Sequence, residues 1–115
     1  MAQYSNLLDD VFQALSDPTR RAVVDRLGRG PASVSELAEP FDMALPSFMK
    51  HVRMLESGGL ITTRKVGRVR TCTLQRSPLT TIEEWLHHQQ RVWEAHTDRL
   101  EHFVTSPVAH QEDPL

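Results

Sequence analysis

The stretch LPSFMKHVRMLESGGL, residues 45–60, decides the fold. A proline near its start and two glycines at its end are the usual start and stop signals of a helix. At helical spacing, positions 48, 52 and 55 share one apolar face, which predicts the buried side, whereas 47, 50 and 54 share another. Lys50, His51 and Arg53 make the helix basic, although the whole chain carries a net charge of −2.

Charge is segregated along the chain. Between Ala44 and Arg76 there are seven Lys or Arg residues against the single acid Glu56, which makes this segment +6. Because the total is −2, the remaining residues carry −8. Nucleic-acid binding requires a local basic surface rather than a basic chain, so the segment 44–76 predicts one.

Length and composition restrict the class of protein. The 115 residues fit one domain, and no run approaches the roughly 18 apolar residues of a membrane span. The first ten residues, MAQYSNLLDD, lack a signal-type apolar core, so we expect a cytoplasmic protein without a membrane partner. One cysteine, Cys72, excludes an internal disulfide and a multi-cysteine metal cluster.

Start and stop signals predict four further helices and a hairpin. Apolar periodicity predicts a first helix over about residues 5–15. Asp17-Pro18 is typical of a helix start, and the Ser33–Glu36 capping box opens a short third helix. Residues 61–74 form two β-branched arms around Gly67, which predicts a hairpin. A long helix runs from Ser77-Pro78 to about Val104, followed by a tail, 105–115, that we expect to be flexible.

These elements predict a fold that is mainly α with a β-hairpin (α+β), in the order α-α-α-α-β-β-α. The short third helix and the helix over 45–57, joined by the link Phe41–Ala44, make a helix-turn-helix, and the hairpin is its wing. We therefore expect one winged helix-turn-helix domain over residues 1–104.

The second helix of a helix-turn-helix enters the DNA major groove. Lys50 is suited to guanine, Ser47 to a base edge, and Leu45 or Met49 to a thymine methyl. His51 and Arg53, further along this helix, are better placed for phosphates. Basic residues at the wing suit phosphates or the minor groove, and Arg20 and Arg21 are further candidates for a flanking phosphate. The predicted DNA-binding set is Leu45, Pro46, Ser47, Met49, Lys50, His51, Arg53, Arg64, Lys65, Arg68 and Arg70.

Two segments, ALSDPTRRAVVDRL and SVSELAEPFDMALPSFMKHVRMLESGGLITTRKVGRVRTCTL, resemble the ArsR-type winged-helix transcriptional repressors. The resemblance covers about residues 10–104. It implies a homodimer on double-stranded operator DNA, with an interface built mainly from the first and last helices. The candidate interface residues are Leu7, Leu8, Val11, Trp85, Trp93, Leu100 and Phe103, and for the last four an intramolecular core is the alternative.

Many members of that family release DNA on binding a metal. Where one subclass has paired cysteines, this chain has Ser33-Val34-Ser35, and hydroxyls are poor ligands for soft metals. Aligning the last helix with a second subclass gives His87, Asp98 and Glu101, with Trp85 in the fourth position. We expect no metal and no cofactor, because a zinc site normally requires four ligands. The chain looks closer to a subgroup without metal ligands, although Ala44 stands where that subgroup usually has Ser.

The prediction is therefore a homodimeric, metal-independent repressor that reads a palindromic operator with residues 45–57 and the wing 61–74. The alternatives are a winged-helix protein–protein module without DNA binding and a metal-responsive repressor that uses the last helix. No set of His, Cys and carboxylate residues suggests an enzyme. Cys72 is expected to be an inert inward thiol, with a redox switch as the alternative. The sequence specifies no effector.

Overall fold

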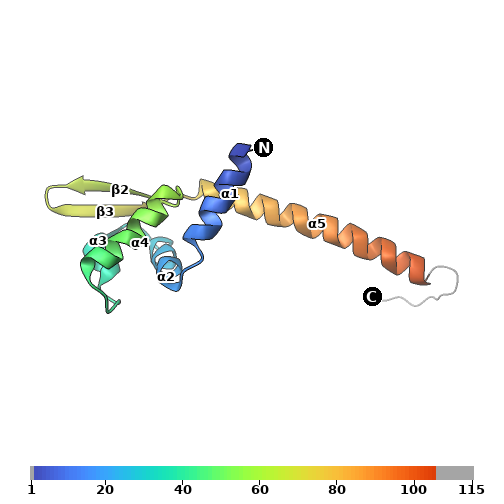
Figure 1. Ribbon diagram of the computed structural model, residues 1–115, viewed down its shortest axis with the longest axis horizontal. Helices are drawn as coiled ribbons and strands as arrows, with labels where there is room; N and C mark the ends of the chain where they lie inside the picture. The colour runs from blue at the N-terminus through green and yellow to red at the C-terminus, as the bar shows by residue number, and fades with distance from the viewer. Residues whose placement is uncertain (1, 106–115) are drawn as a thin grey trace. The chain divides into compact units, whose positions relative to one another are not determined.

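The computed structural model describes residues 2–105, with side chains described from residue 6 to residue 102. The predicted flexible tail, 105–115, lies almost wholly outside the described residues. The chain divides after Ile82 into two units, residues 1–82 and 83–115, and each is described by itself. Figure 1 shows the elements in chain order.

Unit 1 contains four helices ahead of the hairpin and one strand that the sequence did not predict. The helices are α1 (Ala2–Ala14), α2 (Pro18–Leu27), α3 (Val34–Ala38) and α4 (Leu45–Ser57). The strand is β1 (Ala32–Ser33). The first helix was predicted over 5–15, so it begins three residues earlier and ends one residue earlier than expected.

The wing is a hairpin of β2 (Ile61–Val66) and β3 (Val69–Leu74), within the predicted range. The two strands pair antiparallel with Ile61 opposite Leu74 and Val66 opposite Val69. Gly67 has φ +63° in the two-residue turn, a conformation that a side chain would strain. The sheet order is β1-β3-β2, because Ala32 pairs with Cys72 on the other edge of β3.

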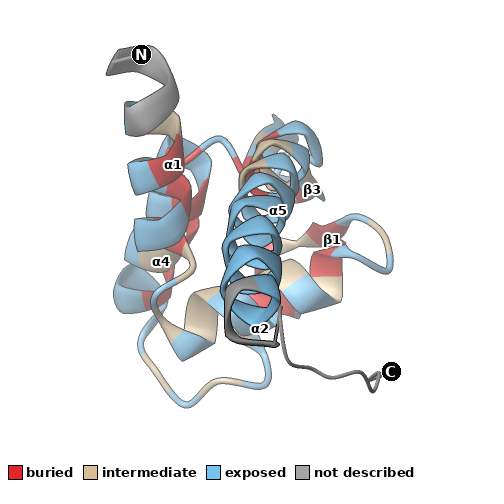
Figure 2. Cartoon of the chain, turned by 90° about the vertical axis from the view of Figure 1, so that its right-hand side faces the viewer, coloured by how far each residue is buried: buried red, intermediate tan, exposed pale blue. Residues whose placement is uncertain are grey.

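The core of unit 1 is aliphatic with one large aromatic side chain, and α1, α2 and α4 all contribute to it. Figure 2 shows buried residues along the facing sides of α1 and α4. Gly58, at the end of α4, permits this packing, because a Cβ there would lie 3.2 Å from the Asp10 carbonyl oxygen and 3.3 Å from the Ala14 Cβ. No polar or charged side chain is buried among those described.

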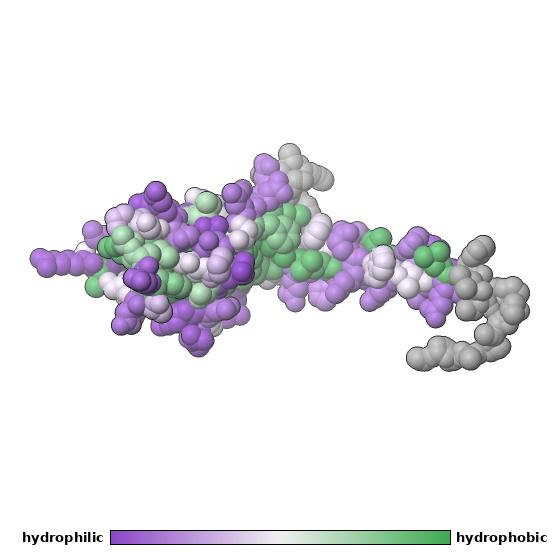
Figure 3. Space-filling model, turned by 60° about the horizontal axis from the view of Figure 1, so that its bottom comes forward, coloured by the Kyte–Doolittle hydropathy of each residue, from purple (hydrophilic) through white to green (hydrophobic). Residues whose placement is uncertain are grey.

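The last helix is α5 (Ser77–Thr105). Its residues up to the buried Ile82 belong to unit 1, and the rest of the helix is the described part of unit 2. Most of its side chains beyond Ile82 are exposed. The exposed ones include Leu86, Val92, Trp93 and Leu100, and Figure 3 shows hydrophobic groups at intervals along this helix. Within the described residues, no helix combines the length and apolar content needed to cross a membrane.

Candidate DNA-binding surface

Helix α4 is held by the inner face that its spacing predicted. Phe48, Val52 and Leu55 have 0%, 1% and 0% of their surface exposed. The Phe48 ring also stacks on Phe41 in the preceding link, with 5.7 Å between ring centroids. Burying three large apolar side chains fixes the rotation of α4 about its axis, since turning it would expose them. The opposite face is therefore presented to solvent in a defined orientation.

That opposite face carries residues predicted to read bases, such as Ser47 and Lys50, together with Arg53, which was predicted to contact phosphate. Ser47, Lys50 and Arg53 are exposed, and Leu45 is 56% exposed at the first helical position. Met49 is half-buried. A polar and basic helix face with an apolar residue at its start matches what a major groove offers, namely acceptors, donors and thymine methyl groups.

The short helix before α4 is positioned by its predicted cap. The Ser33 Oγ accepts from the Glu36 N–H at 3.1 Å, and the Glu36 carboxylate accepts from the Ser33 N–H at 2.8 Å. Hydrogen bonds to its carboxylate from the Ser33 backbone N–H and the Ser33 side chain lower the pKa of Glu36. The capping box therefore fixes where the helix-turn-helix begins.

The wing carries its basic residues exposed. Arg64, Lys65 and Arg68 are exposed, as is Arg70. The Arg70 Nη1 donates to Thr63 Oγ1 at 3.0 Å, and that hydroxyl donates to the Glu56 carboxylate at 3.1 Å. This chain of contacts links the base of the wing to the last turn of α4.

A groove of about 460 Å³ lies between the start of the helix-turn-helix and the wing. Its apolar lining comes from Val34, Leu45, Met49 and Val69, and its basic lining comes from the wing. The full lining set is Ser33, Val34, Ser35, Leu45, Met49, Lys65, Arg68, Val69 and Arg70. Five of the predicted DNA-binding residues thus border one concave surface.

Three residues predicted to contact phosphate have hydrogen-bond partners within the protein. Arg20 directs its guanidinium to the end of α1, where Nε donates to the Ala14 carbonyl at 2.7 Å. His51 is only 22% exposed, and its Nδ1 lies 3.0 Å from Arg20 Nη1. Arg21 likewise donates to the Leu15 carbonyl at 2.8 Å. The sequence signal for these contacts was available, because the carbonyls at a helix C-terminus attract nearby cations.

Asp17 completes this cluster as the predicted N-cap of α2. Its Oδ2 accepts from the Arg20 N–H at 3.1 Å and lies 3.7 Å from His51 Nδ1. Partial desolvation raises the pKa of Asp17, but the Arg20 N–H, the charge of His51 and the Thr19 N–H outweigh it, and the pKa is lowered.

The residues of α1 that were predicted to lie in the dimer interface differ in how far they are buried. Val11 has no exposed surface and Leu8 has 9%, so both belong to the core of unit 1. A side chain without exposed surface does not contact a second chain, which removes Val11 from the candidate interface. Leu7 is half-buried.

On α5, Trp93 is 67% exposed and Leu100 is 51% exposed, while Trp85 is half-buried. The intramolecular core that the sequence left open for Trp93 and Leu100 is therefore not observed. The side chain of Phe103 lies outside the described residues. Leu86 and Val92 are also exposed and were absent from the predicted interface.

The described histidines and acids of α5 do not form a metal site within a single chain. His87 Nε2 lies 3.9 Å from the Glu83 carboxylate, one helical turn earlier. Among the described side chains, no three His, Cys, Asp or Glu residues lie close enough to share a metal ion.

Cys72 points inward from β3, as expected, and has no exposed surface. Burial raises the pKa of its thiol; Glu56 raises it further, and Arg70 opposes the change. Both burial and the raised pKa disfavour the thiolate on which reactivity depends.

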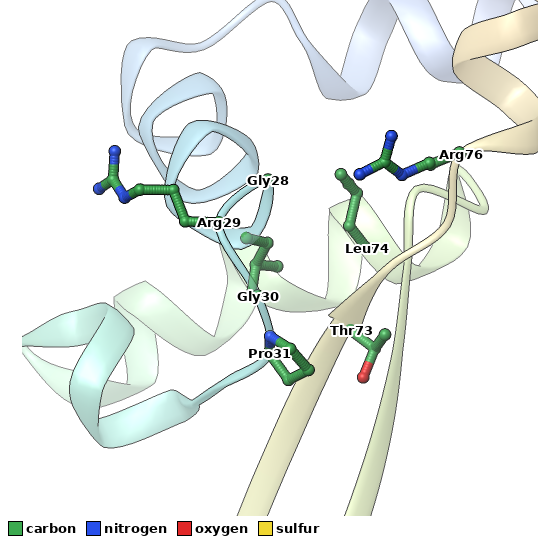
Figure 4. A pocket seen from close by; sticks show the side chains of 8 residues that line it. Gly28, Arg29, Gly30, Pro31, Thr73, Leu74 and Arg76 are labelled. Carbon is green, nitrogen blue, oxygen red and sulfur yellow. The ribbon is translucent and has the colours of Figure 1, made fainter.

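A second hollow, of about 330 Å³, lies between the end of α2 and the end of β3. Figure 4 shows the Arg76 side chain beside Leu74, whereas Arg29 extends away from both. The two cations therefore do not converge on one point, and the hollow does not form an anion site.

Comparisons with known proteins agree with this geometry. A helix-turn-helix domain family matches residues 15–64. The HTH-type transcriptional regulator Rv2034 of Mycobacterium tuberculosis is 36% identical over 74 residues, which cover 64% of this chain and 69% of that protein. A crystal structure of an ArsR family transcriptional regulator is 64% identical with a TM-score of 0.78, covering 82% of this chain and 97% of that chain.

A solution structure from Mycobacterium bovis shares the fold. It is described as a homodimeric winged helix-turn-helix DNA-binding domain (Mb0332, a possible ArsR-family regulator), with 22% identity and a TM-score of 0.59 over 96% of this chain and 93% of that one.

The fold, the exposed basic face of α4 and these relatives define a transcriptional regulator with a helix-turn-helix DNA-binding domain, and not an enzyme. The chain belongs to the ArsR family of winged helix-turn-helix transcriptional repressors, and it lacks the paired cysteines found in some members.

Proposed function

We propose that the protein is a homodimeric, metal-independent repressor that binds an imperfect palindrome in the cytoplasm. The observation that carries the proposal is the anchoring of α4, whose buried inner face leaves Ser47, Lys50 and Arg53 exposed on the outer face. Two such helices, one from each protomer, would enter major grooves about 34 Å apart. The wings would then contact the flanking phosphates or minor groove.

The exposed apolar residues of α5 support the homodimer. Leu86, Trp93 and Leu100 follow one another at intervals of seven residues, so they lie along one stripe of the helix. Each is about half exposed or more in the single chain. A second α5 is a suitable partner for a narrow stripe of this kind, and the related Mb0332 domain is described as homodimeric. Leu7, Leu8, Trp85 and Phe103 remain in the proposed interface.

The donor chemistry supports metal independence. At the position of the paired cysteines the chain offers only the hydroxyls of Ser33 and Ser35, which are weak ligands for soft metals. On α5, His87, Asp98 and Glu101 supply three potential ligands, one short of a typical closed zinc site. A metal site shared between two protomers could supply the fourth ligand, so the experiment below includes zinc.

The deciding experiment is fluorescence anisotropy with the gene's own upstream DNA at two salt concentrations, with EDTA and with zinc. We expect tight binding that weakens steeply with salt, because Lys and Arg contacts release counterions, and that is unchanged by either additive. Release by zinc would overturn metal independence, and His87→Ala would then be the first variant to test. Failure to bind any upstream DNA would favour the protein–protein module. Sedimentation equilibrium tests the dimer directly, and a monomer at micromolar concentration would refute it.

A further inference from the structure

The contacts of Arg20 join three helices of unit 1 at one point. Its Nε donates to the Ala14 carbonyl at 2.7 Å and its Nη2 donates to the Gln13 carbonyl at 3.2 Å. Its Nη1 lies 3.0 Å from Nδ1 of His51 on α4. One guanidinium on α2 therefore contacts the last turn of α1 and the DNA-binding helix at the same time.

The chemistry of arginine assigns the tautomer of His51. A guanidinium has five donors and no acceptor, so Nδ1 must accept the hydrogen bond from Arg20 Nη1. In the neutral ring the proton is then on Nε2. His51 in this state is held by Arg20, and its Nδ1 is not available to a DNA phosphate.

The neighbouring residues show that the contact fixes the position of α4. Ala14, whose carbonyl accepts from Arg20, also lies against Gly58 at the C-terminal end of α4, where a Cβ on residue 58 would be 3.3 Å from the Ala14 Cβ. Helix α4 is thus held at its middle by Arg20 on α2, which also bonds to α1, and at its C-terminal end by the packing of Gly58 on α1. Lys50, the residue before His51, is the main candidate for reading a base.

We propose that Arg20 and His51 form a clamp that positions α4 for specific DNA binding, so that His51 is a positioning residue and not a phosphate contact. The inference rests on the DNA binding proposed above. Helix α1 belongs to the proposed dimer interface. A change in the position of α1 on dimerisation would therefore also move α4 of the same protomer, because Arg20 contacts both helices.

Protonation of His51 distinguishes a clamp from a phosphate contact. A proton on Nδ1 turns the acceptor into a donor, which cannot bond to Arg20 and faces the Asp17 Oδ2 at 3.7 Å instead. The groups that face this nitrogen are Arg20 and Asp17 from α2, with the α1 carbonyls held by Arg20. A clamp therefore weakens as the pH falls, whereas a phosphate contact strengthens with the added charge.

Two amide variants separate the roles of the two ring nitrogens. His51→Asn places an amide oxygen near the position of Nδ1 and keeps an acceptor for Arg20, whereas His51→Gln reaches toward the position of Nε2. We expect His51→Asn to bind operator DNA within a few-fold of the wild type and His51→Gln to bind about ten- to a hundredfold more weakly, as expected for a lost hydrogen bond to a charged group. Arg20→Lys, which keeps the charge but loses the fork, should weaken binding as His51→Gln does.

The preference for operator over unrelated DNA and the pH dependence of operator affinity distinguish the clamp from a general loss of stability. Affinity for unrelated DNA should change little in His51→Gln and Arg20→Lys, and their thermal unfolding is measured alongside. Acidification that protonates His51 should lower the operator affinity of the wild type, and it should lower that of His51→Asn much less. The reverse order of the two amide variants, or a wild-type affinity that rises on acidification, would overturn the clamp.

The ring tautomer tests the clamp without DNA. Long-range proton–nitrogen NMR of the free protein at pH 8 should show His51 protonated at Nε2 only. A ring protonated at Nδ1 refutes the clamp even if operator binding is tight. If the wild type binds no DNA while the ring is protonated at Nε2, the proposed function fails and the Arg20–His51 contact stands.

Discussion

The DNA-binding helix and the wing carry similar basic residues but are held in different ways. Helix α4 buries Phe48, Val52 and Leu55 almost completely, whereas every residue of the wing from 64 to 70 is exposed. The wing is fixed only at its base, where Ile61 and Cys72 are buried. A base edge demands accurate placement, whereas a phosphate backbone tolerates variation. From this difference we infer that α4 reads the sequence and that the wing supplies general affinity.

Anchoring is tested by truncating one residue in each region. Phe48→Ala should lower the free energy of unfolding by about 3–5 kcal/mol, because it removes a fully buried aromatic side chain and leaves a cavity. Val66→Ala, at a position 66% exposed on the wing, is the matched control and should stay within about 0.5 kcal/mol. Urea denaturation followed by circular dichroism measures both. Similar losses in the two variants would show that the wing is anchored as firmly as α4.

Base reading is tested at Lys50. Lys50→Ala should remove about 1–3 kcal/mol of discrimination at the base pair it contacts, since that is the usual contribution of a good base contact. The measurement is a binding competition against operators that carry each base at every position of one half-site. The expected result is that the preference disappears at one or two adjacent positions. Unchanged preferences at all positions would show that Lys50 contacts phosphate.

Arg68 is the matching position on the wing. Arg68→Ala should weaken all DNA sequences similarly and reduce the slope of log affinity against log salt by about 1 for each phosphate that the variant no longer neutralises. Anisotropy titrations at four salt concentrations, with operator and unrelated DNA, give both quantities. If Lys50→Ala and Arg68→Ala both weakened binding uniformly, the division between base reading and phosphate binding would be wrong.

The sequence predicted the helix-turn-helix and the wing closely because their signals are local. Pro46 and Gly58 bound α4, the Ser33 capping box starts α3, and Gly67 sets the turn of the hairpin. The strand β1 was missed because it has only two residues, and its pairing with Cys72 depends on a segment about forty residues away in sequence.

The candidate site was predicted less completely than the fold. Burial of the face of α4 follows from helical spacing, and so does exposure of Lys50. The role of His51 does not, because its partner Arg20 lies 31 residues earlier and approaches only once α1, α2 and α4 have packed. Charge suggested a phosphate contact for both residues, and tertiary packing gave each a partner inside the protein.

The smallest expected effect concerns the first turn of α4. Ala44 is the N-cap and supplies no side-chain hydrogen bond. A serine hydroxyl there would ordinarily accept from the N–H of the second or third helical residue, but the second is Pro46, which has none. Only the Ser47 N–H remains. Ala44→Ser should therefore stabilise the protein toward the lower end of the usual range of about 0.5–2 kcal/mol.

Thermal unfolding at a fixed protein concentration measures this gain, and Ala44→Gly is the control that changes the backbone without adding a cap. The effect of Ala44→Ser on operator preference is the more informative result. If the buried Phe48 already holds the first turn in place, Ala44→Ser raises stability and leaves operator preference unchanged. A sharper preference at the bases near Ser47 would mean that this turn frays in the free protein, and that the accuracy of α4 as a reader depends on its cap as well as on its buried face.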